Sequence, residues 1–337
     1  MEAAGAKKKK MLATLVGCNY AGTPYELQGC INNVHAMRAV LLDRFGFTPG
    51  DVTVLTDDHD RGRGAGVLPT GAGVKRALAD MVARAAPGDV LFFHFSGHGT
   101  LVPPVNGRPR RGHGHRDDEA IVPCDFNLIT DADFRELVDR VPAGATFTMV
   151  SDSCHSGGLI DQEKEQIGPD AVAHPDLHAG ARAARFLPYA AVLVHLSGAS
   201  GVGASHHVAD HLLALFGADT SAKFHLHRSD HEGNSSGAAR TDDAGILLSG
   251  CQTDETSADV AGDDVAAAGG RACGAFSAAL QAVLAAHAAP MSNREVVRRA
   301  REVLGEQGFQ QHPCLYCSDA NADAPFLGQQ ETKAKSN

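Results

Sequence analysis

Two short motifs each place a residue of catalytic type directly after an apolar run. SGHG occupies positions 96–99 after the run 90–95, and DSCHSGG occupies positions 152–158 after the run 146–150. A thiol beside an imidazole forms the thiolate more readily, and the thiolate is the reactive nucleophile. The two motifs therefore predict nucleophilic catalysis, with Cys154 as the nucleophile and His98 as the base.

Residue chemistry alone leaves alternatives to this pair open. A cysteine after a buried strand is also typical of an inert, apolar thiol. His94 and His155 are alternative bases. His94 falls inside an apolar run and is typical of a core histidine, whereas His155 directly follows Cys154, and consecutive residues at a strand end point apart.

The elements that must position these motifs follow from the hydrophobic periodicity. Apolar runs predict strands at 11–18, 51–55, 90–96, 146–152, 245–251 and 314–318. Helical periodicity predicts helices at 31–45, 73–85, 131–141, 274–288 and 292–304. Buried strands alternating with helices indicate an α/β fold with a mostly parallel sheet covered on both faces. Catalytic residues in such sheets lie at the carboxyl ends of strands, so both motifs should face one crevice.

The alternation of strands and helices stops near residue 161. The segment 161–240 is rich in Gly, Ala, Ser, Asp and His, and only 189–196 and 208–216 have a helical pattern. Because it is too long for an ordinary loop, we expect a functional linker that is partly disordered. One domain in two pieces follows: a large catalytic region 1–160, the His-rich linker 161–240, a small region 241–329 that completes the sheet, and a tail 330–337.

Charge, hydropathy and cysteine content argue against some classes of binding partner and cellular location. The net charge of -10 and the pI of about 5.9 argue against nucleic acid. No apolar stretch reaches the roughly 20 residues of a membrane helix, and no signal peptide is apparent. The eight cysteines include several within apolar runs, which is typical of free thiols in a reducing compartment. We expect the cytoplasm, with the apoplast and the nucleus as alternatives.

The motifs also resemble those of a known family. HFSGHG followed by DSCHSGG is similar to the caspase clan and, within it, to the metacaspases. Further segments resemble type II plant metacaspases with a short linker: LVGCNYAGTPYELQGCINNV at 15–34, DEAIVPCDFNLITDADFRELV at 118–138, LIDQEKEQIGPD at 159–170, LLSGCQTDETSADV at 247–260 and GFQQHPCLYCSDANADAPFL at 308–327. The likeness covers nearly the whole chain outside the linker.

This resemblance implies a caspase-like α/β sandwich and a cysteine endopeptidase that cleaves proteins or peptides after Arg or Lys. Cys154 and His98 would form the dyad. The two motifs by themselves already predict an oxyanion hole from the backbone N–H groups around Gly99 and Cys154. The resemblance further implies a monomer made as a zymogen and cut in the linker. Arg185 lies where the family's cleavage site falls, and Arg182 is the second candidate.

The family's pocket for the P1 side chain, the residue before the cleaved bond, has two acidic residues. Asp152 matches the first, but Asn33 stands where the family has the second. Ser96 and Cys30 match the other pocket positions. With one negative charge left, we expect the Arg/Lys preference to persist with a lower kcat/KM. The alternative is a pseudoprotease that binds basic segments with little or no cleavage.

Calcium is a cofactor of many metacaspases, and it prefers six to eight oxygen ligands. The candidate ligands here are Asp117, Asp118, Glu119 and Asp161. The preceding loop 106–116 is basic and has no acidic residue, which opposes binding of a dication. We therefore expect calcium independence and no cofactor.

Overall fold

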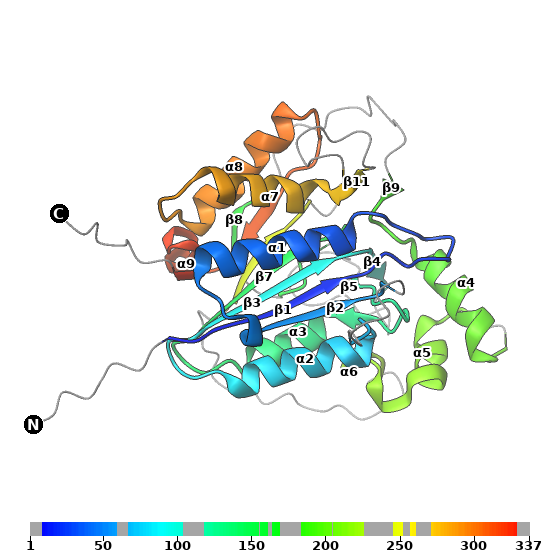
Figure 1. Cartoon of the computed structure of the whole chain (residues 1–337). Coiled ribbons are helices and arrows are strands. Elements are labelled where there is room, and N and C mark those ends of the chain that lie inside the picture. The colour runs from blue at the N-terminus through cyan, green and yellow to red at the C-terminus, as the bar shows by residue number, and fades with distance from the viewer. Residues whose placement is uncertain are drawn as a thin grey trace, which may run out of the picture.

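A seven-stranded sheet runs through the middle of the molecule (Figure 1). The computed structural model describes residues 9–58, 67–103, 118–154, 156–160, 164–168, 183–203, 205–225, 245–251, 257–260 and 271–328. In spatial order the strands are β2 (Val52–Thr56), β1 (Met11–Gly17), β3 (Val90–Ser96), β7 (Thr146–Asp152), β10 (Gly245–Ser249), β13 (Cys314–Tyr316) and β8 (Glu165–Ile167). The first five are parallel, and β13 pairs antiparallel with β10 and with β8.

Helices cover both faces of this sheet (Figure 1). One face carries α1 (Cys30–Phe45), α7 (Ala275–Ala286) and α8 (Asn293–Glu306), and the other carries α2 (Gly71–Arg84) and α3 (Asp131–Val138). The linker contributes α4 (Tyr189–Ser200), α5 (Val208–Phe216) and α6 (Ala222–His225), and the last α-helix of the described residues is α9 (Asp319–Asp323). Figure 1 shows α4 and α5 beyond the carboxyl ends of the central strands.

The continuous apolar run of β3 reflects burial on both faces. Leu91, Phe93 and Phe95 join the core beneath α2 and α3. The alternate residues, Val90 and Phe92, join the core beneath α1, α7 and α8. Because successive side chains of a strand point to opposite faces, a strand buried on both sides is apolar at most positions, and in β3 the polar residues are His94 and Ser96.

Two three-stranded sheets adjoin the main one. The first has the order β4 (Gly99–Val102), β5 (Asp118–Ile121) and β6 (Ile129–Thr130). The second has the order β12 (Cys273–Gly274), β11 (Ala258–Val260) and β9 (Ala183–Ala184). The sequence predicted neither of them, nor β8, because strands of two to four residues are too short to show a period.

The major elements agree with the sequence prediction to within a few residues. The helix expected over 131–141 ends earlier, at Val138, and Thr130 and Asp133 form a capping box at its start. Within the linker, the two helical patterns correspond to α4 and α5. In the part of the chain that the structure describes, no helix is long and apolar enough to cross a membrane.

Candidate active site

The two catalytic motifs follow neighbouring parallel strands. Ser96, the last residue of β3, pairs in register with Asp152, the last residue of β7. His98 and Cys154 each lie two residues further along their own strand-end loops. Parallel register therefore brings both motifs to one edge of the sheet, as the sequence predicted.

His98 is held by two tyrosines of the loop after β1. Its backbone N–H donates to the Tyr20 hydroxyl at 2.9 Å, and its ring Nε2 lies 2.8 Å from the Tyr25 carbonyl oxygen. A carbonyl only accepts, so Nε2 carries the proton and Nδ1 has the lone pair. Among the described residues, Nδ1 has no hydrogen-bond partner. The nitrogen available to act as a base is therefore Nδ1.

Burial keeps this histidine neutral. His98 is 4% exposed, and burial lowers its pKa below the ordinary value of 6.5. The hydrogen bond to Tyr25 opposes this shift, and the positive charge of Arg185 adds to it. A neutral imidazole with a free lone pair is the form that accepts a proton.

Cys154 is fully buried and has contacts on both its thiol and its backbone. Its Sγ accepts a hydrogen bond from the Ser257 N–H at 2.9 Å. Its own N–H points to the Arg185 carbonyl oxygen at 3.3 Å. The nucleophile candidate therefore lies directly beside the peptide group of Arg185.

An extended segment from the linker occupies this site. The Arg185 N–H donates to the Ser257 carbonyl at 2.9 Å, and the Leu187 N–H donates to the Gly99 carbonyl at 2.9 Å. Between them, the Arg185 carbonyl accepts from the N–H groups of Gly99 at 3.0 Å and Cys154 at 3.3 Å. Two N–H donors on one carbonyl oxygen is the arrangement of an oxyanion hole. The two residues named from the sequence for this role are thus brought together around one carbonyl.

The Arg185 side chain is completely buried in a polar pocket. Nη1 donates to the Ser96 hydroxyl at 2.7 Å and to the Asp152 carbonyl at 3.0 Å, and lies 3.3 Å from the Asp152 carboxylate. Nη2 donates to the Asp259 carboxylate at 2.8 Å. Burial alone would lower the guanidinium pKa, but the charges of Asp152 and Asp259 raise it. The arginine is therefore a paired cation.

A second acidic residue beside the Arg185 guanidinium corrects an expectation from the sequence. A pocket with one negative charge was predicted because Asn33 replaces an acid, but Asp259 supplies another carboxylate. Asn33 does not hydrogen-bond the guanidinium. Its Nδ2 donates to Ser96 at 2.9 Å and to Asp152 at 3.4 Å, and its Oδ1 accepts from the Gly274 N–H at 3.2 Å. Cys30 is buried nearby, and burial raises the pKa of its thiol to about 12.

The alternative bases have different surroundings. His94 is fully buried, and its Nε2 lies 3.0 Å from the Ser277 hydroxyl. Burial lowers its pKa to about 4. These features are those of a neutral core histidine. His155, like the second cleavage candidate Arg182, lies outside the described residues.

The calcium candidates are only partly described. Asp118 forms an ion pair with Lys223 of α6, and Glu119 accepts a hydrogen bond from the Gly158 N–H at 2.5 Å. Asp117 and Asp161 lie outside the described residues. Within the described ranges, no group of three or more His, Cys, Asp or Glu side chains is arranged to hold a metal.

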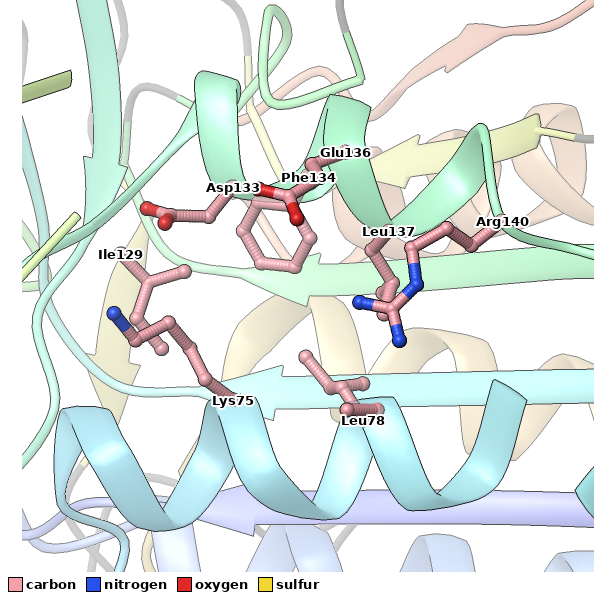
Figure 2. Close-up of a pocket in the computed structure, with 9 residues that line it drawn as sticks. Lys75, Leu78, Ile129, Asp133, Phe134, Glu136, Leu137 and Arg140 are labelled. Carbon is pink, nitrogen blue, oxygen red and sulfur yellow. The ribbon is translucent and has the colours of Figure 1, made fainter. Parts of the chain in front are cut away.

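A separate groove of about 190 Å³ lies between α2 and α3 (Figure 2). Figure 2 shows Lys75 and Leu78 on one wall and Phe134 and Leu137 on the other. None of its lining residues contacts Arg185. The groove is therefore not part of the site around Cys154.

Sequence reasoning missed four residues that shape this site. They are Tyr20, Tyr25, Ser257 and Asp259. All four lie in segments that carried the family resemblance, which is the one signal that marked them. No local pattern separates them from their neighbours, because their roles depend on long-range packing.

Comparison with known proteins agrees with this geometry. A family model described as a caspase domain matches residues 10–325. Metacaspase-9 of Arabidopsis thaliana is 52% identical over 331 residues, which cover 95% of this chain and 98% of that protein. Metacaspase-7 of the same plant is 36% identical over 411 residues, covering 94% of this chain and 99% of that protein.

The fold is also found among solved structures. A crystal structure of a protein from Geobacter sulfurreducens matches with a TM-score of 0.57 at 19% identity, covering 96% of this chain and 100% of that one. At this identity the match supports the fold alone. Together with the caspase-domain match, it confirms the predicted caspase-like α/β sandwich. The chain therefore belongs to the caspase-domain family of cysteine peptidases and, within it, to the metacaspases.

Proposed function

We propose that this metacaspase is an endopeptidase that cleaves after Arg or Lys, and that it is made as a zymogen whose first substrate is its own Arg185–Phe186 bond. One observation carries the proposal. The Arg185 carbonyl accepts hydrogen bonds from Gly99 and Cys154 while its guanidinium is buried against two carboxylates. A peptide held in this way has the position of a substrate about to be cleaved.

The reaction assigns one role to each group of the dyad. His98 Nδ1 takes the thiol proton, and Cys154 Sγ forms a bond to the Arg185 carbonyl carbon. The Gly99 and Cys154 N–H groups stabilise the negative oxygen that results. His98 then gives its proton to the Phe186 nitrogen as the C–N bond breaks, which leaves a thioester. Water, deprotonated by His98, hydrolyses the thioester and frees the thiol.

Preference for a basic P1 residue follows from the burial of charge in the pocket. Two buried carboxylates without a cation would be costly, and a neutral side chain would leave them unpaired. Arg and Lys are the side chains that supply the missing positive charge. Asp152 and Ser96 are the P1 contacts that the sequence identified, and Asn33 lies behind them.

We further propose that cleavage needs no calcium. The ion pair of Asp118 with Lys223 supports this, because the lysine already neutralises one candidate ligand from within the chain. Cleavage in buffer containing a calcium chelator, at a rate equal to that with added calcium, is the expected result. A requirement for calcium would contradict it.

The central experiment measures cleavage of fluorogenic peptides with Arg, Lys or Asp at P1. We expect the wild type to cleave the first two and not the third, and Cys154→Ala and His98→Ala to cleave none. Cys317→Ala, which removes another fully buried thiol away from the site, is the matched control and should retain activity. Arg185→Ala should prevent cleavage of the chain itself.

Two outcomes of this experiment would contradict the proposal. If the wild type binds Arg-containing peptides but cleaves none, the chain is a binding protein for basic segments and the endopeptidase proposal is wrong. Cleavage that persists in Cys154→Ala would equally reject the assignment of the nucleophile.

A further inference from the structure

We infer that this protein also joins peptides, because the thioester on Cys154 is open to attack by a peptide amine that the protein holds beyond the cut bond. The inference rests on the proposed function, since it concerns the fate of the same intermediate. The acceptor is a peptide with a free α-amino group and an apolar second residue. The chain's own segment beginning Phe186–Leu187 has both features once the bond is cut.

The two residues after the bond are bound through Gly99. Phe186 pairs with Gly99 in a parallel β-bridge, and the Leu187 N–H donates to the Gly99 carbonyl at 2.9 Å. The Leu187 side chain is 2% exposed and belongs to the apolar core beneath α2 and α3, as does Val192 of α4. Gly99 therefore holds both sides of the bond, because its own N–H donates to the Arg185 carbonyl.

The first helix of the linker, α4, is fastened to the large region. The Tyr25 hydroxyl donates to the Ala191 carbonyl at 3.3 Å. The His195 ring stacks on the Phe126 ring with 3.7 Å between centroids. Cleavage of the Arg185–Phe186 bond removes none of these contacts, so the new amine stays beside the nucleophile until α4 leaves.

A second anchor lies at the end of α5. Lys75 of α2 donates to the carbonyl oxygens of Asp219 at 2.6 Å and Thr220 at 3.0 Å, and Asn127 donates to the Asp219 carbonyl at 3.0 Å. Carbonyls at a helix end lack partners within the helix, and a cation there is stabilising. The segment after the bond must therefore break contacts at two places before it departs.

The thioester on Cys154 then has two competing nucleophiles, water and the Phe186 amine. When the amine attacks, its nitrogen forms a bond to the Arg185 carbonyl carbon and the carbon–sulfur bond breaks. His98 Nδ1 takes the proton from the amine and returns it to the Cys154 sulfur. The products are a peptide bond and a free thiol, so the step needs no further reactant.

The geometry favours the amine over water. A correctly oriented neighbouring group can have an effective concentration of about 10⁵ M or more. Cys154 is fully buried and His98 is 4% exposed, so water has little access while the segment is in place. Joining should therefore be faster than hydrolysis until the chain's own segment leaves, after which a peptide of the same kind can take its position.

The first test follows a labelled acyl group onto the chain's own amine. The self-cleaved full-length protein receives an excess of biotinyl-Ala-Ala-Arg methyl ester, which repeats residues 183–185. The thioester carries biotin on the fragment with Cys154, whereas joining places it on the fragment that begins at Phe186. We expect biotin on the second fragment in a denaturing gel, and an intact mass increased by one biotinyl-Ala-Ala-Arg group.

Variants of the chain test whether Leu187 holds the acceptor. Leu187→Asp should lower this labelling at least about 10-fold, because a charge replaces a buried apolar side chain. Val194→Asp is the matched control, since Val194 of α4 is 68% exposed, and its labelling should equal that of the wild type.

Free acceptor peptides give a second measurement that does not depend on how a variant folds. With the wild-type protein, Phe-Leu-Pro-Tyr should yield at least about 10-fold more joined product than Phe-Asp-Pro-Tyr at equal concentration. N-acetylated Phe-Leu-Pro-Tyr, which lacks the amine, should yield none. The ratio of joining to hydrolysis should rise from pH 6.5 to 8.5, because an α-amino group has a pKa of about 8 and only its neutral form attacks.

The outcomes separate this inference from the proposed function. Hydrolysis of the ester without biotin on the Phe186 fragment or on either peptide would overturn the joining activity. Equal yields from the two free peptides would overturn the bound acceptor. If the wild type does not cleave the ester, or if Cys154→Ala still cleaves it, the proposed function itself is rejected.

Discussion

At the residue scale, the chemistry depends on how His98 is held. The Tyr20 hydroxyl accepts from the His98 N–H at 2.9 Å and donates to the Val122 carbonyl at 2.5 Å. The centroids of the Tyr20 and His98 rings lie 4.8 Å apart. Tyr20 is thus a positioning residue that links the loop carrying His98 to the segment that directly follows β5.

Removing that hydroxyl should weaken both the fold and the reaction. Tyr20→Phe leaves the buried His98 N–H and Val122 carbonyl unpaired, at a cost of about 1–3 kcal/mol in unfolding free energy. We expect a lower Tm in the Cys154→Ala background and slower self-cleavage in the active chain. Tyr25→Phe is the matched control, because Tyr25 holds His98 through its backbone carbonyl. Equal effects of the two changes would contradict the role of Tyr20.

The pH dependence of self-cleavage should report the burial of His98. Burial lowers its pKa below 6.5, so the neutral base persists to a lower pH than an exposed histidine would allow. The unfolded chain takes up this proton at a higher pH than the folded chain, so stability is complete above about 6.5 and falls below it. We expect the acid limb of the rate profile below pH 6.5. A midpoint at or above 6.5 would be inconsistent with a buried base.

Restoring the acidic residue that the family has at position 33 should not speed cleavage. In Asn33→Asp, a carboxylate would replace the amide that donates to Asp152 at 3.4 Å, and like charges at that distance repel. We therefore expect self-cleavage no faster than in the wild type. Asn32→Asp, at the exposed neighbouring position, is the control. A clear gain in rate for Asn33→Asp would show that Asp259 does not replace the missing charge.

Sequence reasoning identified the site residues that strands carry directly. His98 and Cys154 follow apolar runs, and parallel pairing brings strand ends together. Ser96 and Asp152 stand in the same two motifs, but only the family resemblance marked them as pocket residues. Asp259 could not be found in the same way, because its approach to Arg185 depends on the pairing of two- and three-residue strands. No periodicity encodes such a contact.

At the scale of elements, β12 forms one wall of the pocket that holds the Arg185 side chain. A Cβ on Gly274 would contact the Asp152 carboxylate and would lie 2.5 Å from Arg185 Cζ. Real side-chain atoms do not approach so closely, so only glycine leaves room for the Arg185 side chain here. The long helices and parallel strands were predictable from their periods, but this wall was not.

Filling that space should abolish the reaction. We expect Gly274→Ala to stop self-cleavage and to lower the Tm, because the methyl group displaces the guanidinium or Asp152. Gly305→Ala in α8 is the matched control. Nothing lies within 4 Å of its added Cβ, and alanine should raise helix stability by about 1 kcal/mol. Normal cleavage by Gly274→Ala would show that the wall is displaced easily.

At the scale of the whole molecule, the central sheet is built from both sides of the Arg185–Phe186 bond. β7 precedes the bond and β10 follows it, and the two pair in parallel over five residue pairs. β8 also precedes the bond and pairs with β13, which follows it. Cutting the chain therefore severs no strand of this sheet.

Two consequences should be measurable. Self-cleavage within one molecule should have a first-order rate that does not change on dilution. The two fragments should then co-elute in gel filtration and separate only in denaturant. A rate that rises in proportion to protein concentration would show cleavage between molecules, and separation in native buffer would contradict the shared sheet.

Under the proposed function, the buried Arg185 would also act as a competitive inhibitor that is part of the chain itself. A tethered ligand has an effective concentration on the order of millimolar, which a dilute protein substrate cannot match. The uncut chain would then exclude other substrates by occupancy, because Arg185 and Leu187 already hydrogen-bond to the backbone of the site. Turnover of foreign peptides should begin after a lag that ends when residues 183–187 leave the site, so the release of this first product sets the timing of activity.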